Sequence, residues 1–333
     1  MNFDNRIRKN FIVFCLLLGV SIPSYAEVDW VSVTLDNDLF VGNDNGYTNG
    51  LYVSFFDVGD ASSQLPDYDF WVTPLMWSMP KNGTLGAVNS YMIGQTMSTP
   101  SDINIVVPDE NELPYAALLS LTNSYVAVTP TYADRVSTTI GIVGPAALGE
   151  EAQKFVHDII GADEPQGWDT QLKNELVFQF SRGRIWRTWA SDSGHFDFLT
   201  SADLGLGTIQ SYLSTGMTIR YGRDLVKSYA TNLLNNSRTT NPSAVNGGWY
   251  IYGGIQAGYA FNQIFTDGNT FRDSRSIDYE HEYIGVTAGI AYSWQNFSLT
   301  FAVNDSNVIQ SGDGEETLEN LTQYGTITVA WRM

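Results

Sequence analysis

Hydrophobic and polar residues alternate along several stretches of this chain. From Tyr283 to Trp294 every second residue is apolar, and the residues between are mostly small or polar. The stretches 249–262 and 297–304 show a similar alternation. Because successive side chains of a β-strand point to opposite faces, each stretch predicts a strand with one apolar and one small or polar face.

The composition of the polar faces favours a membrane barrel over a soluble β-sandwich. These faces carry Gly, Ser, Thr and Tyr rather than Lys and Glu, which suits a barrel lumen better than a water-exposed surface. In 47–57, for example, Thr48, Gly50 and Ser54 are predicted to face the lumen, whereas Leu51 and its alternating neighbours are predicted to face lipid. Frequent aromatic residues and dispersed glycines are also typical of outer-membrane barrels.

Strand-like runs number about twelve, an even count of the kind that a closed antiparallel barrel with both termini in the periplasm requires. We therefore predict an all-β fold, a twelve-stranded antiparallel transmembrane β-barrel with a short helix in an extracellular loop. The runs lie near 28–38, 47–57, 87–98, 114–129, 132–143, 171–183, 194–206, 210–222, 247–262, 282–294, 296–305 and 322–333.

The first 26 residues are predicted to be a cleaved signal peptide, which leaves residues 27–333 as a single barrel domain. Basic residues at the start precede a short apolar core, 11–20, and Ser24-Tyr-Ala26 supplies the small residues of a cleavage site. The only cysteine, Cys15, lies in this segment. No disulfide framework is therefore expected in the mature chain.

Charge excludes one class of partner. The chain holds 17 Lys and Arg against 36 Asp and Glu, a net charge of −19, whereas binding nucleic acid requires a positive surface. An anionic lipid partner would need divalent cations to bridge the two negative surfaces. No later stretch approaches the roughly 18 consecutive apolar residues of a transmembrane helix.

A helical segment interrupts the β pattern between Gly144 and Asp163. Gln153 and His157 are four residues apart and share one helix face, and Gly161 is predicted to end the helix. Four apolar residues form a different face, which we expect to pack over the barrel mouth: Ala152, Phe155, Val156 and Ile159.

Counting strand directions places three distant segments at one rim. The end of the first run at 36–38, the start of the second at 47–50 and the helix with His157 all fall on the side away from the termini, which is the extracellular side. The connection 59–86 falls at the other end and is long for a periplasmic turn. Its Trp71, Met76 and Trp77 are expected to pack at the membrane interface or to plug the barrel.

Candidate chemistry is limited. Asp36-Asn37-Asp38 offers hard oxygen ligands of the kind that Ca²⁺ binds, although a strand-end turn or cap explains the same residues. The chain has no His-x-Ser pair, no Gly-x-Ser-x-Gly elbow and no zinc-ligand spacing. The hydrolytic mechanism that remains is attack by a water molecule that a histidine activates, with a bound cation polarising the carbonyl of the substrate. His195 and His281 lie beside acidic residues and are interpreted as structural.

Several short motifs together carry a family resemblance over essentially the whole mature chain. The sequence resembles the outer-membrane lipid A 3′-O-deacylase family. This resemblance implies a twelve-stranded barrel whose site lies between the barrel wall and the external helix, and Ca²⁺-dependent removal of the 3′ acyloxyacyl chain of lipid A. The motifs are Asp36-Asn-Asp-Leu-Phe40, Tyr47-Thr-Asn-Gly-Leu51, Pro114-Tyr-Ala116, Ile142-Val-Gly-Pro145, Gln153-Lys-Phe-Val-His157-Asp-Ile-Ile-Gly-Ala162 and Gln166-Gly-Trp168.

The resemblance also implies the site residues. Asn37, Asp38, Thr48 and His157 fall where the family places its site, and Gln153 and Asp163 match neighbouring positions. Asp38 and Asn37 are the expected Ca²⁺ ligands, and His157 is the expected base, oriented by Gln153 or Asp163. The chain departs from the family in one respect, because no Lys or Arg occurs between Lys81 and Arg135, which leaves open how lipid A phosphate is held.

Two alternatives remain at this stage. A non-enzymatic barrel would be a small channel with a water-filled lumen, and an esterase could act on phospholipid instead of lipid A. The expected partners are lipopolysaccharide and the lipids of the bacterial outer membrane. We expect a monomer that binds no nucleic acid and whose active site faces the cell exterior.

Overall fold

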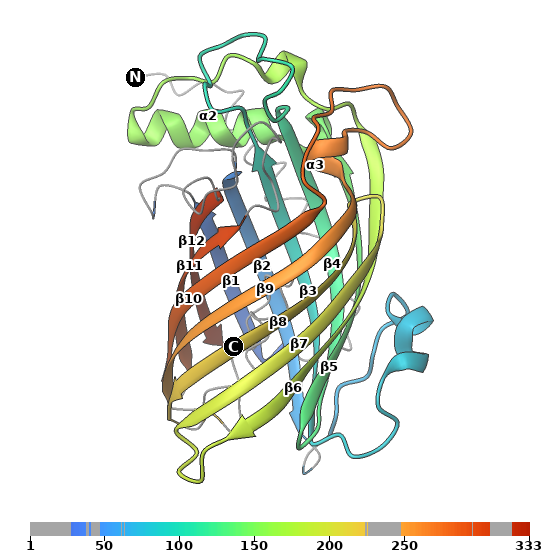
Figure 1. Ribbon diagram of the computed structural model, residues 1–333, viewed down its shortest axis with the longest axis vertical. Helices are drawn as coiled ribbons and strands as arrows, with labels where there is room; N and C mark the ends of the chain where they lie inside the picture. The colour runs from blue at the N-terminus through green and yellow to red at the C-terminus, as the bar shows by residue number, and fades with distance from the viewer. Residues whose placement is uncertain are drawn as a thin grey trace.

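Twelve antiparallel strands close into a barrel in the computed structural model (Figure 1), as the alternation predicts. The structure describes residues 28–37, 40, 47–60, 62, 64–223, 225, 248–294, 296–306 and 322–333, so the predicted signal peptide lies outside it. Strands adjacent in sequence pair with each other, and β1 pairs with β12 to close the barrel. The strands are β1 (Trp30–Asn37), β2 (Tyr47–Asp60), β3 (Gly86–Ser98), β4 (Ala116–Val128), β5 (Tyr132–Val143), β6 (Glu175–Ala190), β7 (Phe196–Gly207), β8 (Gln210–Gly222), β9 (Trp249–Gln263), β10 (Glu282–Trp294), β11 (Phe297–Ser306) and β12 (Thr322–Arg332).

Strand β6 is the one whose predicted bounds differ most from the structure. The sequence predicts a run over 171–183, but β6 continues to Ala190. Arg182, near the end of the predicted run, and Arg184, in the extension, lie on the outward face of β6, where charges break the apolar pattern expected beside lipid. Both guanidiniums are paired with Asp134 of β5, which a linear pattern does not reveal.

The lumen is filled by side chains in the described part of the chain. Buried ion pairs lie inside the wall, among them Arg135 with Asp203 at 2.8 Å and Arg220 with Asp197 at 2.6 Å. The apolar outward faces are as predicted, because in β10 Ile284, Val286, Ile290 and Tyr292 are exposed. A water-filled channel is therefore poorly supported by the described strands.

Lumenal glycines are paired with tyrosines of neighbouring strands. A Cβ atom on Gly205 would overlap the ring of Tyr212, because that ring lies across the bare backbone. The small and aromatic residues of the lumenal faces thus interlock instead of leaving space. The same arrangement recurs at Gly94 with Tyr52, Gly258 with Tyr283, and Gly289 with Tyr252.

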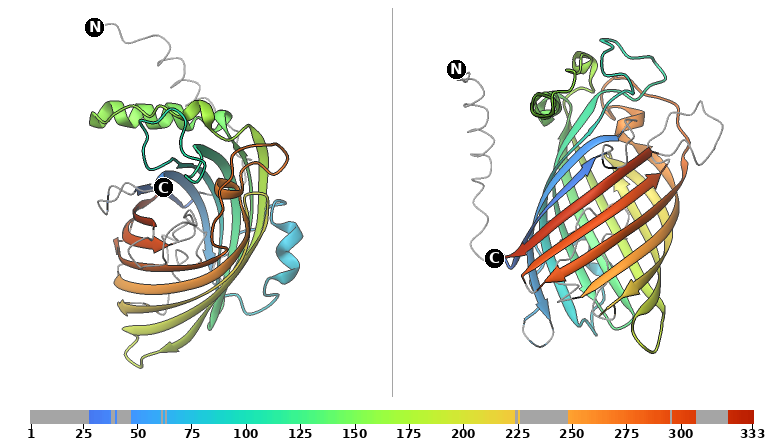
Figure 2. Two further views of the ribbon diagram at one scale, coloured as in Figure 1. Left: turned by 45° about the horizontal axis from the view of Figure 1, so that its top comes forward. Right: turned by 90° about the vertical axis from the view of Figure 1, so that its left-hand side faces the viewer.

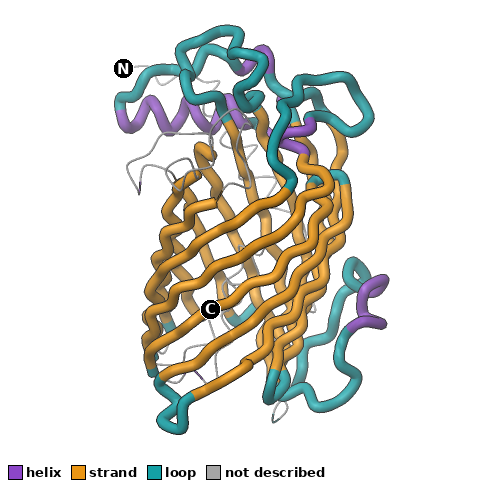
Figure 3. Tube along the Cα trace, in the orientation of Figure 1, coloured by secondary structure: helices purple, strands orange, loops and turns teal. Residues whose placement is uncertain are grey.

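The helices lie in connections between strands (Figure 3). At the end where β1 stops and β2 starts lie η3 (Pro145–Ala147), α2 (Gly149–Ile160), η4 (Trp168–Thr170) and α3 (Ile264–Asp267) (Figures 1 and 2). We call this end the helix-bearing rim. None of the described helices is long and apolar enough to span a membrane.

The connection between β2 and β3 lies on the outside of the barrel, towards the end where β1 begins and β12 ends, which is meant below by the end that holds the termini (Figures 1 and 2). It contains η2 (Thr73–Ser78), and its Val72 is fully buried against outward-facing Tyr125 and Val136. The segment thus packs against the outer wall, and its predicted placement at the membrane interface stays a prediction. The described residues of this connection do not plug the lumen.

Candidate functional site

Helix α2 is seated on the outer face of β4. A Cβ atom on Gly149, the first residue of α2, would overlap Ala117 and Trp168, so the helix starts in direct contact with the wall. Leu148, before it, adopts the left-handed conformation with φ of 60°. Gln95 donates from Nε2 to the carbonyl of Ala147 at 2.6 Å. Together these contacts fix where α2 begins.

The face of α2 that packs differs from the predicted one. Gln153 is buried and its Oε1 accepts a 2.7 Å hydrogen bond from Nε1 of Trp168, which is itself buried beside Tyr115. Phe155 and Ile159, by contrast, are 55% and 68% exposed. Part of the apolar face therefore points away from the barrel, and a buried polar pair anchors the helix.

The end of α2 places a backbone carbonyl against His157. Gly161 has φ of 74°, which ends the helix as predicted, and its N–H donates to the carbonyl of His157. The reversed chain brings the carbonyl of Asp163 to 2.5 Å from Nδ1 of His157. A carbonyl can only accept, so Nδ1 carries the proton and Nε2 has the lone pair of a base.

His157 is thus oriented by main chain, whereas the sequence predicts a side chain of Gln153 or Asp163. Gln153 is engaged with Trp168, and the contact from Asp163 comes from its carbonyl. The other two histidines also hold carbonyls through Nδ1, His195 that of Gly222 and His281 that of Ala260. These contacts fit the interpretation of His195 and His281 as structural residues. His157 differs from them by its position in α2 at the helix-bearing rim.

Asp36 and Asn37 lie on opposite faces of β1. Asp36 is fully buried inside the barrel, where its Oδ1 accepts a 2.7 Å hydrogen bond from Thr326. Strand alternation therefore places Asn37 on the outer face. Of this pair, only Asn37 is placed to bind a ligand outside the wall.

Asn37 belongs to a row of outward residues that leads to the seat of α2. It pairs with Asn49 of β2, which pairs with Met97 of β3, which pairs with Ala117 of β4. Three strand spacings make this row about 14 Å long, and eight residues of α2 carry His157 about 12 Å from the helix start. Helix α2 lies at this same rim (Figure 2), and the nearness of His157 to Asn37 stays a prediction.

Two predicted site residues are not fully described. Asp38 lies outside the described residues, and of Thr48 only the backbone is described, at an irregularity of β2 between Tyr47 and Asn49. Within the described ranges, no group of three Asp, Glu, His or Cys residues could hold a metal ion. The Ca²⁺ site accordingly stays a prediction.

Asn49 and Gln95 were not predicted as site residues. Both occupy outward positions near the rim, where alternation predicts apolar residues, and that mismatch was the available signal.

The connections at this rim also bind one another. Gln166 N–H donates to Ile103 at 2.8 Å, and Arg275 Nη1 donates to Pro108 at 3.0 Å.

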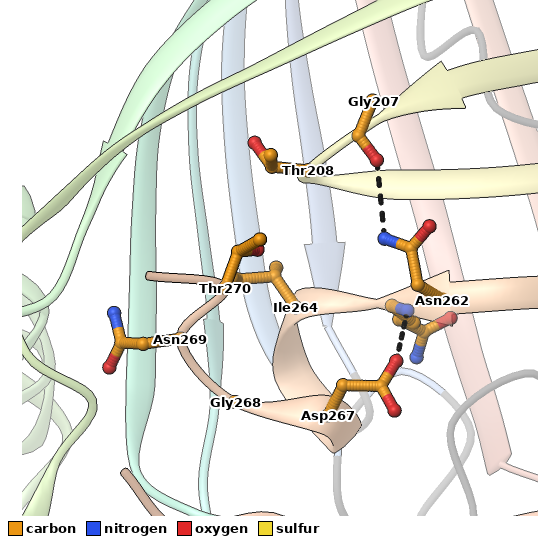
Figure 4. A pocket seen from close by; sticks show the side chains of 9 residues that line it. Gly207, Thr208, Asn262, Ile264, Asp267, Gly268, Asn269 and Thr270 are labelled. Atoms are coloured by element: carbon orange, nitrogen blue, oxygen red, sulfur yellow. Dashed lines mark hydrogen bonds between the residues drawn. The ribbon is translucent and has the colours of Figure 1, made fainter. Parts of the chain in front are cut away.

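A pocket of about 220 Å³ lies at the same rim but away from these residues (Figure 4). It is lined by the β7–β8 turn and by residues around α3, and Asn262 donates to Gly207 across it at 3.2 Å. Asp267 accepts hydrogen bonds from Gln263 N–H and from the Tyr279 hydroxyl. Burial, with Asp267 beside it, raises the pKa of Tyr279 to about 12. None of the predicted site residues lines this pocket.

Comparison with known proteins identifies the family. The family described as "Outer membrane protein LpxR" matches residues 11–333. The chain belongs to the LpxR family. The solved structure of LpxR from Salmonella typhimurium has the same fold, with a TM-score of 0.71 and 17% identity over 91% of this chain and 100% of that one. The family expected from the sequence is thereby confirmed, and with it an outer-membrane barrel.

Other barrels are more distant from this LpxR family member. The β domain of the Bordetella autotransporter BrkA has a TM-score of 0.44 and 9% identity, over 92% of this chain and 99% of that one. A KdgM porin has a TM-score of 0.37 and 7% identity, over 91% and 99%. No curated protein sequence matches the chain.

Replacing Gln153 by alanine tests the anchor of α2. The change leaves the buried Nε1–H of Trp168 without its acceptor, which costs about 1–3 kcal/mol. We expect amide hydrogen exchange along α2 to accelerate correspondingly, and Trp168→Phe to restore part of the protection of Gln153→Ala. The matched control is Lys154→Ala, which removes an exposed pair with Glu150 and should leave exchange nearly unchanged. Equal exchange in Gln153→Ala and Lys154→Ala would refute the anchor.

Proposed function

We propose that this LpxR family member is an outer-membrane esterase that removes the 3′-linked acyloxyacyl chain from lipid A. One observation carries the proposal: the 2.5 Å contact of His157 Nδ1 with the Asp163 carbonyl, which leaves Nε2 as a base at the helix-bearing rim. The row from Asn37 to Ala117 supports a site on the outer wall, where a lipid approaches from the membrane.

The chemistry assigned to His157 is general base catalysis. Nε2 takes a proton from water, and the resulting hydroxide adds to the ester carbonyl carbon. Collapse of the tetrahedral intermediate breaks the bond to the 3′ oxygen of the sugar, which receives the proton from His157. The products are a free acyloxyacyl acid and lipid A with a 3′ hydroxyl. The Asp163 carbonyl stabilises the imidazolium through Nδ1–H.

Calcium is the proposed cofactor. The Asn37 amide oxygen on the outer face and the Asp38 carboxylate are hard donors of the type that Ca²⁺ binds, with main-chain oxygens completing the set. Asp36 is not assigned to the site because it faces the lumen and is bonded to Thr326. When bound, the cation would polarise the ester carbonyl. Strict alternation predicts a lumenal Thr48, but the register shifts between Tyr47 and Asn49, and such a bulge can re-aim a side chain. On that basis the Thr48 hydroxyl is assigned a donor role to the oxyanion, worth roughly 3–4 kcal/mol for a well-placed group.

Exposed apolar residues near the site favour a lipid substrate. Phe155, Ile159 and Leu148 are exposed on or beside α2, and acyl chains would cover such surface. With the termini in the periplasm, the helix-bearing rim faces the cell exterior, where lipid A resides. We propose this orientation of the barrel in the outer membrane together with the activity.

The test uses purified protein in vesicles that contain hexa-acyl lipid A and phospholipid, followed by mass spectrometry of both lipids. We expect the mass of lipid A to fall by one acyloxyacyl chain, with fragmentation locating the loss at the 3′ position. Loss of fatty acid from phospholipid alone would instead identify a phospholipid esterase. Steady conductance in planar bilayers without lipid turnover would support the channel, which the filled lumen disfavours.

A further inference from the structure

The outer wall of β3 to β6 is polar towards the end that holds the termini. Arg135 of β5 faces the lumen, so its neighbour Asp134 points outward. The register pairs Asp134 with Arg184 of β6, and Arg182 lies two residues before Arg184 on the same outward face. Asp134 is fully buried outside the lumen and pairs with both arginines at 2.6 Å. Arginine on a lipid-facing wall costs about 2–4 kcal/mol near the bilayer centre, so bare lipid is an unfavourable neighbour here.

Residues 64–85, here called the outer segment, cover this polar wall (Figures 1 and 2). Polar groups on its underside meet polar groups of the wall. Asp69 accepts from Asn89 at 2.7 Å, and the Trp71 carbonyl accepts from Thr138 at 2.7 Å. Ser78 accepts from Nε of Arg182 at 3.0 Å. Groups of the outer segment therefore supply hydrogen-bond partners to Asn89, Thr138 and Arg182 of the wall.

The middle of the outer segment is uncharged and exposes large apolar side chains, and exposed charged residues at 67 and 81 flank it. No Asp, Glu, Lys or Arg occurs between Phe70 and Pro80. Phe70 and Trp77 are 71% and 80% exposed, and Tyr68 is exposed beside them. A water-facing element places its polar side outward, whereas this segment turns its polar side to the barrel.

An aromatic belt of the barrel has a gap where the outer segment lies. Aromatic residues cluster at the two interfaces of membrane barrels. At the end that holds the termini, outward and exposed aromatic residues occur on β6 to β12, but none of the exposed aromatic residues in the described chain lies at that end of β1 to β5, a gap that includes the strands under the outer segment. The belt comprises Trp186, Trp189, Phe196, Tyr221, Trp249, Tyr292, Trp294, Phe297 and Trp331.

We propose that the outer segment is a lipid-contacting surface which continues this belt across β3 to β5. Phe70 and Trp77 contact phospholipid acyl chains and the adjoining interface in the leaflet nearest the termini. The segment thereby replaces lipid over the Asp134 cluster, and the polar wall stays inside protein although it lies outside the lumen. Arg184, which lies 4.3 Å from the Tyr132 ring centroid and 5.9 Å from that of Trp186, joins the covered wall to the belt.

The test places a nitroxide label at position 77 by Trp77→Cys, with Cys15→Ala in every variant. The protein is reconstituted in vesicles of phosphatidylethanolamine and phosphatidylglycerol, and the collision rates with oxygen and with a water-soluble nickel complex are compared. Leu213→Cys, exposed on the outer face of β8, gives the lipid reference. Ser193→Cys, in the exposed β6–β7 turn, gives the water reference.

We expect the oxygen-to-nickel ratio at position 77 to be severalfold above that at 193 and closer to that at 213. A ratio closer to that at 193 would show that the segment faces water and would overturn the proposal. Phe70→Cys provides the same measurement independently, should the change at Trp77 disturb insertion. The readout does not depend on lipid A turnover, so it stands apart from the proposed esterase.

Discussion

Replacing His157 by alanine is expected to lower the rate of lipid A 3′-deacylation by about 10²–10⁴-fold, the contribution that a positioned general base makes. The imidazole is held by the Asp163 carbonyl through Nδ1, so alanine removes the base and the group that returns the proton. Because His157 lies on the loop helix and only part of its surface is buried, the barrel itself should fold normally. Mass spectrometry of lipid A from cells that express each variant at equal levels gives the rate.

The matched controls are His195→Ala and His281→Ala. Both histidines make the same Nδ1 contact with a carbonyl as His157 does, at 2.8 and 2.7 Å, so they control for the loss of such a contact. We expect deacylation in both to stay within a few-fold of the wild-type rate. Wild-type turnover by His157→Ala, in protein that still shows the heat-modifiable migration of a folded barrel, would remove His157 from the mechanism.

Chelation of Ca²⁺ is expected to abolish deacylation, and adding Ca²⁺ back to restore it. Replacing Asp38 by asparagine tests the proposed ligand, because this change keeps the shape of the side chain but removes its charge. If Asp38 is a ligand, the Ca²⁺ concentration for half-maximal rate should rise, and the rate at low Ca²⁺ should fall by about 10²–10³-fold, as when a stabiliser of the oxyanion is lost.

Asp36→Asn is the control two residues away. Its carboxylate lies in the lumen and accepts from Thr326, an interaction that an amide oxygen preserves. We expect the Ca²⁺ dependence of Asp36→Asn to match that of the wild type. Identical titrations for Asp38→Asn and the wild type, or full activity in chelator, would refute the proposed metal site.

The strands were predictable because the membrane and the lumen impose opposite chemistry on alternate residues. All twelve predicted runs correspond to strands. The alternation rule failed at Arg182 and Arg184, where the wall faces neither lipid nor lumen but the outer segment. No local pattern predicts that a connection will fold back over the wall, since the contacts that hold it there join residues 20 to 104 positions apart.

The candidate site was predictable in place but not in its contacts. Counting strand directions put the His157 helix and the first hairpin at one rim, which the structure confirms for Asn37 and α2. The carbonyl of Asp163 was missed because a main-chain contact depends on the turn at Gly161 and not on side-chain type. The helix face was assigned wrongly because hydrophobicity predicts burial of Phe155, whereas the Gln153–Trp168 pair decides the orientation.

The glycine–tyrosine interlock inside the barrel bears on the cell as well as on the protein. Porin-sized openings admit hydrophilic drugs and detergents to the periplasm, and a strongly expressed open cylinder would carry that risk. Here the rings of Tyr52, Tyr212, Tyr252 and Tyr283 lie across the backbone of facing strands. We therefore expect expression of the folded barrel to leave the outer membrane no more permeable to such solutes.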